Sequence, residues 1–345
     1  MEIPSSAKSI GDYAFGGCKG LTSVMITEGV EVIGDGAFEG CDGLTSVEIP
    51  SSAKRIGGGA FEGCKGLTSV MIAEGVEDFG NGAFKGCDGL ISVQIPSSVK
   101  MVGQAAFKDC IGLESVTIPD GVVYIGDWAF AGCHALSSVK IPASVKNIES
   151  GTFEDCIGLK SATIPASVSK IEAFAFTGCS RLASVSIPFG VTSIGEAAFK
   201  GCTGLVSIDI PTSVMLIGYW AFMGCCSLKS VTIPPSVTRI ESRTFEECCR
   251  LTSATIPFGV TSIENAAFKG CTGLVSIDIP TSVMWIGDGA FTGCSALTSV
   301  KIRDEATRIE GRAFGGCIAL ASVTVASRVM RVEDLDFWGC QDDPL

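Results

Sequence analysis

The sequence predicts a mostly β solenoid, and two regularities support that fold class. A phenylalanine occupies every twenty-third position, and 15 such repeats account for all 345 residues without an insertion or deletion. A cysteine stands three residues after each of these phenylalanines. A fixed period between about 20 and 50 residues is typical of solenoids, in which each repeat contacts only its neighbours. We therefore predict one continuous repeat domain over residues 1–345, with residues 336–345 as its C-terminal end. The phenylalanines are Phe15, Phe38, Phe61, Phe84, Phe107, Phe130, Phe153, Phe176, Phe199, Phe222, Phe245, Phe268, Phe291, Phe314 and Phe337.

Two strands are predicted in each repeat. The first has the pattern Leu-x-x-Val-x-Ile, as in Leu21, Val24 and Ile26, which places the Val and the Ile on one face of a strand. Proline follows in most repeats, and because it cannot donate a ladder hydrogen bond, it should end this strand. A second pattern, Val-x-x-Ile, as in Val191 and Ile194, is β-branched and predicts a second row of short parallel strands.

The segment before the phenylalanine predicts a single helical turn. Glycine or an acid opens it, followed often by Asp or Ser and then by Ala-Phe. Acids at this position would complement the exposed amides of a helix start. Since Asp109, Asp155 and Glu247 replace the glycine that usually precedes the cysteine, we do not expect that position to require a positive φ.

The whole pattern, Leu-x-x-Val-x-Ile-Pro-x-x-Val-x-x-Ile-Gly-x-x-Ala-Phe-x-Gly-Cys, resembles the BspA-like leucine-rich repeats of bacterial surface proteins and of unicellular eukaryotes. The resemblance covers all 15 repeats. It implies a leucine-rich repeat solenoid that is right-handed and curved, with a parallel sheet on the concave side. It also implies roles in adhesion and in binding other proteins.

Composition narrows the range of partners. The chain has 25 basic and 37 acidic residues, a net charge of -12, which would repel nucleic acid and anionic membrane surfaces. Its apolar residues come in short groups, far from the roughly 20 consecutive ones that a membrane span requires. We expect no nucleic-acid partner and no membrane insertion.

No pattern typical of an enzyme or a cofactor site is present. His134 is the only histidine, in a row expected to face water, without a nucleophile or an orienting acid in its own repeat. A row with one cysteine in each repeat is linear, whereas zinc needs a tetrahedral set. Stacked acids are too few for calcium and are expected to be solvated. We predict no catalytic, cofactor or metal site. The stacked acids are Glu149 with Glu172, Glu241 with Glu264, and Glu310 with Glu333.

The two ends of the sequence differ. Met1 leads directly into a repeat without the pattern of a signal peptide, so we expect a cytoplasmic protein if the chain is complete and a surface or secreted protein if it is a fragment. The first repeat has no polar cover, which indicates either further sequence upstream or self-association through this edge. In the last repeat Asp336 and Asp343 replace apolar residues and should end the solenoid.

Two of the 17 cysteines depart from the repeat position. The other 15 are expected to point into the core as small apolar side chains. Cys226 and Cys249 come one position later in successive repeats, in a row that carries Lys19 and His134 elsewhere and should face water. This pair is a candidate for a disulfide or a reactive thiol, with ordinary free thiols as the alternative.

The first strand of each repeat offers the main candidate binding surface. The residues on either side of its inward Val should face outward, as a row of serines beside a variable row. Concave solenoid faces commonly bind partners, although a simply solvated face is the alternative. The residues that we expect to contact a partner are Ser115, Thr117, Ser138, Lys140, Ser161, Thr163, Ser184, Ser186, Ser207, Asp209, Ser230 and Thr232.

A second candidate surface is the position two residues before the phenylalanine. It is aromatic at Tyr13, Trp128, Phe174 and Trp220, and the last three should lie on the outer side. Such side chains either anchor an interface or pack against neighbouring repeats.

These patterns favour a non-enzymatic interaction or adhesion scaffold, which binds protein or peptide through the concave Ser/Thr strand face. The alternative is a purely structural, self-associating repeat protein without a specific ligand.

Overall fold

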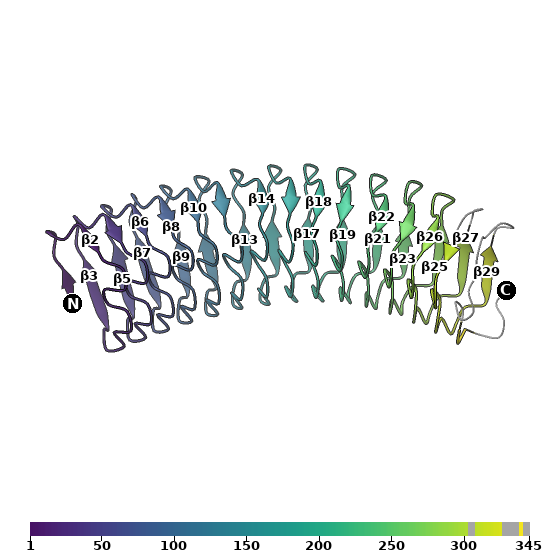
Figure 1. Ribbon diagram of the computed structural model, residues 1–345, viewed down its shortest axis with the longest axis horizontal. Helices are drawn as coiled ribbons and strands as arrows, with labels where there is room; N and C mark the ends of the chain where they lie inside the picture. Colours follow the sequence, from purple (N-terminus) through teal and green to yellow (C-terminus); the bar gives the residue numbers. More distant parts are fainter. Residues whose placement is uncertain (303–307, 326–337, 341–345) are drawn as a thin grey trace. The chain divides into compact units, whose positions relative to one another are not determined.

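The computed structural model describes residues 1–302, 308–325 and 338–340, which form strands and turns without a helix. Figure 1 shows the succession of coils, most of which have one longer and one shorter strand. The chain groups into two compact units, Met1–Val168 and Ser169–Leu345, and each is described by itself. The single continuous domain expected from the period stays a prediction.

The first unit contains both predicted rows of strands. The row with the Leu-x-x-Val-x-Ile pattern has β1 (Glu2–Ile3), β3 (Ser23–Ile26), β5 (Ser46–Ile49), β7 (Ser69–Ile72), β9 (Ser92–Gln94), β11 (Ser115–Thr117), β13 (Ser138–Lys140) and β15 (Ser161–Thr163). The second row has β2 (Ser9–Ile10), β4 (Val32–Ile33), β6 (Arg55–Ile56), β8 (Asp78–Phe79), β10 (Met101–Val102), β12 (Tyr124–Ile125) and β14 (Asn147–Ile148).

The second unit repeats this arrangement. Its first row has β17 (Ser184–Ser186), β19 (Ser207–Asp209), β21 (Ser230–Thr232), β23 (Ser253–Thr255), β25 (Ser276–Ile279), β27 (Ser299–Ile302) and β29 (Ser322–Val325). Its second row has β16 (Lys170–Ile171), β18 (Ser193–Ile194), β20 (Leu216–Ile217), β22 (Arg239–Ile240), β24 (Ser262–Ile263), β26 (Trp285–Ile286) and β28 (Arg308–Ile309).

Strand pairing is parallel and follows the sequence period. Ser92 of β9 pairs with Ser115 of β11, and Ser299 of β27 pairs with Ser322 of β29. Each residue therefore meets its own equivalent in the next repeat. A slip by one residue would turn the buried Val and Ile toward water, which fixes this register. The predicted β-solenoid is confirmed.

The predicted helical turn is wrong. In the second repeat, alternate amides donate to the next repeat, from Gly36 to Gly58, from Phe38 to Ala60 and from Gly40 to Glu62, at 2.7–2.8 Å. The intervening amides of Ala37, Glu39 and Cys41 each donate to the carbonyl three residues earlier, which closes separate four-residue turns and not a continuous helix. Gly36 and Gly40 have φ values of 60° and 65°, and two left-handed residues this close interrupt any right-handed helical run.

The expectation that the position before the cysteine does not require a positive φ is also wrong. Asp109, Asp155 and Glu247, which replace glycine there, have φ values of 60°, 53° and 60°. The turn thus imposes a left-handed backbone on whatever residue is present. Non-glycine side chains adopt it at some cost in stability.

The core of each unit is a stack of identical side chains. Consecutive phenylalanine rings in Phe176–Phe199–Phe222 stack with centroids 5.4–5.5 Å apart and nearly parallel planes. Beside them the cysteine thiols donate to backbone, as from Cys202 to the Phe176 carbonyl at 3.1 Å. Full burial of one such phenylalanine stabilises the fold by about 1.5–3 kcal/mol.

The core side chains of the first repeat are less buried than those of the next repeat. In the first repeat Phe15 is half-buried and Cys18 is exposed, whereas Phe38 and Cys41 of the next repeat are fully buried. Self-association through this edge stays a prediction. Asp336, Phe337 and the predicted terminus 341–345 lie outside the described residues.

Candidate functional site

The strand face of the first unit presents the predicted residues to water. Ser115 and Thr117 of β11, Ser138 and Lys140 of β13, and Ser161 and Thr163 of β15 are all exposed, on either side of an inward residue. β13 and β15 pair in register, so that Lys140 lies beside Thr163. The outward orientation of this row is as expected, and its role in binding stays a prediction.

The strand face of the second unit has the same construction. Ser184, Ser186, Ser207, Asp209, Ser230 and Thr232 are exposed on β17, β19 and β21. Ser186 and Asp209 are direct neighbours in the ladder. A carboxylate therefore stands within a surface of hydroxyl groups, which supply both hydrogen-bond donors and acceptors.

Two exposed phenylalanines near this face were not predicted from the sequence. Phe189 and Phe258 are 76% and 75% exposed, the highest values among the large apolar side chains of the described residues. Each follows the proline that ends a strand, at a position where other repeats carry mostly small or polar residues. That departure from the repeat was the available signal. A shallow hollow beside Phe258 is also lined by Thr255 and Asp278 of the strand face.

Of the aromatics two residues before the core phenylalanine, Tyr13 is exposed and the other three are half-buried. Trp128 lies over Gly151 of the next repeat, where an added Cβ would come within 2.3 Å of the indole, and its Nε1 donates to Glu154 at 2.9 Å. Phe174 and Trp220 are likewise half-buried, each with a positive φ. Packing between repeats accounts for Trp128. An interface role for these aromatics stays a prediction.

Cys226 and Cys249 lie side by side at the surface. Their Sγ atoms are 3.6 Å apart, and each sulfur is 3.3 Å from the carbonyl oxygen of Glu247. Cys226 is half-buried and Cys249 exposed, both as free thiols. Burial, followed by the contact with Cys226, raises the pKa of Cys249.

The row of cysteines in the core is shielded from solvent. Thirteen of the 17 cysteines are buried. Burial raises the pKa of Cys64 and Cys156 to about 12. Because the thiolate is the reactive form, these buried thiols are unreactive at neutral pH.

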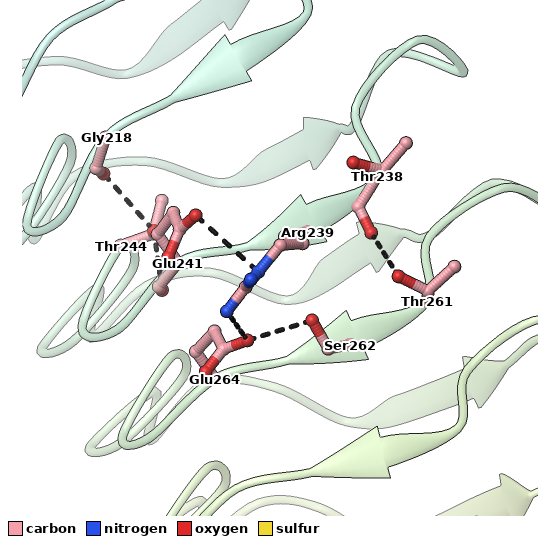
Figure 2. Close-up of polar contacts among 8 residues, drawn as sticks. All are labelled: Gly218, Thr238, Arg239, Glu241, Thr244, Thr261, Ser262 and Glu264. Atoms are coloured by element: carbon pink, nitrogen blue, oxygen red, sulfur yellow. Dashed lines mark hydrogen bonds and ion pairs between the residues drawn. The ribbon is translucent and has the colours of Figure 1, made fainter.

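An ion-pair cluster replaces the solvated acids expected at Glu241 and Glu264. Glu264 is only 6% exposed, so that expectation is wrong for this pair. Figure 2 shows Arg239 between the two carboxylates, 2.7 Å from Glu264 and 3.8 Å from Glu241. Ser262 donates a further hydrogen bond to Glu264 at 2.9 Å (Figure 2).

Glu241 is less well satisfied than Glu264. Its Oε2 is buried and has no hydrogen-bond partner among the described residues. Burial is the largest cause that raises the pKa of Glu241, and the nearby charge of Arg239 opposes it. Because the guanidinium occupies the space between the two acids, the geometry favours an internal ion pair over a bound cation.

The histidine and the other possible metal ligands do not form a cluster in the part of the chain that the structure describes. His134 is exposed. No cluster of three or more His, Cys, Asp or Glu side chains that could hold a metal occurs among the described residues. Nor does any of this part form a helix of the length and apolarity needed to cross a bilayer.

Comparison with known families gives a match along nearly the whole chain. A family model described as the BspA type leucine rich repeat region matches residues 1–114, 100–228 and 216–342. No curated protein sequence matches.

Several solved structures are similar to this chain. A leucine-rich repeat protein from Bacteroides ovatus has 35% identity and a TM-score of 0.85, over 94% of this chain and 86% of that one. One from Eubacterium ventriosum has 27% identity and a TM-score of 0.52, over 78% and 82%. The pneumococcal vaccine antigen PcpA, with 20% identity and a TM-score of 0.55 over 94% and 78%, shares the fold.

Proposed function

The chain belongs to the BspA-type leucine-rich repeat family, and from that membership we propose that it is a non-enzymatic scaffold that binds protein or peptide. Leucine-rich repeat proteins in general bind proteins or peptides, and the family is generally non-enzymatic. A repeated sequence favours this role because it places like groups beside like, whereas catalysis needs unlike groups brought together.

The proposed contact surface is the Ser/Thr strand face of each unit. Its hydroxyl groups are small and exposed, and each can donate and accept a hydrogen bond. Lys140 in the first unit and Asp209 in the second add single charges to this surface. Such charges give specificity and orient a partner more than they add affinity.

The observation that carries the proposal is the exposed phenylalanine beside the strand face. Phe258 borders a hollow that also includes Thr255 and Asp278. Phe189 has the same place in a nearly identical segment, since Ile187–Ile210 recurs three repeats later as Ile256–Ile279. Large aromatic side chains at a protein surface are frequent anchors of binding interfaces.

A peptide library displayed on phage, selected against the immobilised full chain, tests the proposal. We expect selected peptides to bind Asp209→Lys, Lys140→Glu or Phe189→Ser variants at least about tenfold more weakly than the wild type, a loss of about 1.4 kcal/mol. Because Phe189 is 76% exposed, its replacement should leave the thermal stability unchanged. Lys200→Glu is the matched control, since Lys200 is exposed but lies outside the strands.

Equal binding by all four variants would contradict the strand face as the contact surface. A failure to select any peptide, together with sedimentation showing concentration-dependent assembly, would favour the alternative of a structural, self-associating repeat protein. An adhesion role would require that the selected sequences occur in extracellular proteins.

A further inference from the structure

We propose that Cys226 and Cys249 form an oxidation site, at which hydrogen peroxide converts the two thiols into a disulfide that joins successive repeats. This site is independent of the proposed binding function. Three features of the molecule support it: the position of the two sulfurs, their exposure, and the contacts of the segment between them.

The geometry brings the sulfurs to the distance from which a bond can form. They are 3.6 Å apart, whereas a disulfide bond is about 2.05 Å long. Both cysteines lie in turns, at equivalent positions of successive repeats. Repeats that stack at the spacing of their strands, about 4.8 Å, fall within the range of about 4.4–6.8 Å that disulfides span between Cα atoms. Closing the bond therefore requires side-chain rotation and a small backbone shift.

The solvent exposure of their side chains distinguishes Cys226 and Cys249 from most other cysteines of the chain. Apart from the thirteen buried ones, only Cys18, Cys226, Cys249 and Cys340 are accessible to solvent. Cys18 belongs to the first repeat, and Cys340 donates to the carbonyl of Phe314 at 3.3 Å. Among the described residues, Cys226 and Cys249 alone are accessible cysteines in successive repeats whose sulfurs contact each other.

The reaction proceeds in two balanced steps. The more exposed thiol, Cys249, loses its proton to solvent, and its sulfur attacks one peroxide oxygen. The O–O bond breaks, and the leaving hydroxide takes up a proton from solvent, which gives a sulfenic acid and water. Cys226 then attacks the sulfenic sulfur, the S–S bond forms, and the S–O bond breaks with loss of a second water. Overall, two thiols and one hydrogen peroxide give one disulfide and two waters.

The segment enclosed by this disulfide contains two ion-paired glutamates, Glu241 and Glu246, each with one buried oxygen that accepts no hydrogen bond among the described residues. In both residues this oxygen is Oε2, and both lie between Cys226 and Cys249 in the sequence. Buried groups of this kind favour local opening, because opening returns them to water. The disulfide would restrain this segment against such opening.

The test uses the full chain with Cys18→Ser and Cys340→Ser, which leaves two accessible thiols. After reduction and treatment with a small excess of hydrogen peroxide, we expect the native thiol count to fall from two to zero and the mass to fall by the two lost hydrogens. Digestion with trypsin without reductant should yield the peptides 201–229 and 244–250 joined by a disulfide. The melting temperature of the oxidised chain should rise by about 5 °C.

The matched control adds Cys249→Ser to the same chain. It retains Cys226, and we expect no joined peptides and no rise in melting temperature after peroxide. Joined peptides that persist in this control would show that another cysteine, such as Cys248 or Cys225, is responsible. That result, or an unchanged thiol count in the parent chain, overturns the proposal. If the disulfide forms without any rise in melting temperature, the claim that it restrains the enclosed segment is wrong.

Discussion

Arg239 lies between two carboxylates, that of the buried Glu264 and that of the half-buried Glu241. Its guanidinium contacts Glu264 at 2.7 Å and Glu241 at 3.8 Å, while its own side chain is 54% exposed. The two acids differ in how well the protein solvates them. Glu264 also accepts a hydrogen bond from Ser262, whereas one oxygen of Glu241 is buried without a partner among the described residues.

We expect Glu264→Gln to lower the free energy of unfolding at pH 7 by about 2 kcal/mol, since it removes the charge of a nearly buried ion pair. Glu241→Gln should leave the free energy of unfolding unchanged or higher. The pKa of Glu241 lies above its ordinary value of 4.5, so the folded chain favours the neutral form that Gln copies. Thermal unfolding followed by circular dichroism would measure both variants.

The sign of the pH dependence follows from the raised pKa. The contribution of Glu241 to stability is complete below pH 4.5 and is lost as the pH rises through the higher pKa of the folded state. Glu241→Gln should therefore make the fall of the melting temperature between pH 4.5 and 7 shallower. Equal slopes in this variant and in the wild type would contradict this assignment.

At the scale of elements, the turn around the core phenylalanine acts as a third ladder of hydrogen bonds. Alternate amides of each turn donate to the next repeat, as the strands do. This arrangement requires left-handed residues on both sides of the phenylalanine. Gly224 and Glu247 occupy the same position of successive turns, with φ values of 71° and 60°.

Exchanging the residue types at these two positions should have opposite effects. Glu247→Gly removes a strained non-glycine residue and should raise the free energy of unfolding by about 0.5–1 kcal/mol, while Gly224→Ala should lower it by about 1 kcal/mol. Space is not the cause, because a Cβ on Gly224 would lie 3.8 Å from its nearest neighbour. Chemical denaturation measures both changes, and two changes of the same sign would be incompatible with this account.

The strands could be predicted from sequence, but the turn could not. The alternating Val and Ile of β3 specify a face to bury, and the exposed Ser23 and Met25 follow from the same alternation. The turn depends on hydrogen bonds to the next repeat, which exist only when repeats stack. Gly-x-x-Ala-Phe therefore has the local features of a helix start, although its alternate amides donate to the next repeat.

Residues of the candidate site were predicted from the sequence only where they occupy a position that recurs in every repeat. The exposure of Lys140 and Asp209 was expected because strand residues alternate. The position of Arg239 between Glu241 and Glu264 was not predicted. The two acids share one position of the repeat, whereas the arginine stands at a different position, two residues before Glu241. Phe189 and Phe258 were not predicted, because residues common to all repeats give no information about residues that differ from the repeat.

At the scale of the whole molecule, the number of repeats should be adjustable. Deleting residues 187–255 removes three repeats and joins Ser186 to Ile256, which begins a nearly identical sequence. We expect the shortened chain to keep the same circular dichroism per residue and a cooperative unfolding transition, because repeat stability is a sum over units and their interfaces.

The comparison for this deletion is the removal of residues 187–244, which ends in the middle of a repeat. It places Phe176 and Phe268 out of register, so apolar side chains of the joined repeats no longer meet. We expect that chain to bind a hydrophobic dye and to aggregate. Similar behaviour of the two deletions would rule out the period as the determinant of folding.

The buried cysteines have a practical consequence for measuring local motion. In most interior repeats one buried thiol donates to the carbonyl of the phenylalanine in the preceding repeat, as Cys202 does to Phe176. A maleimide added to the native protein can modify such a sulfur only when its coil separates from the adjoining coils. The alkylation rates, resolved by mass spectrometry of the individual peptides, would therefore give a profile of opening equilibria along the chain at one position per coil.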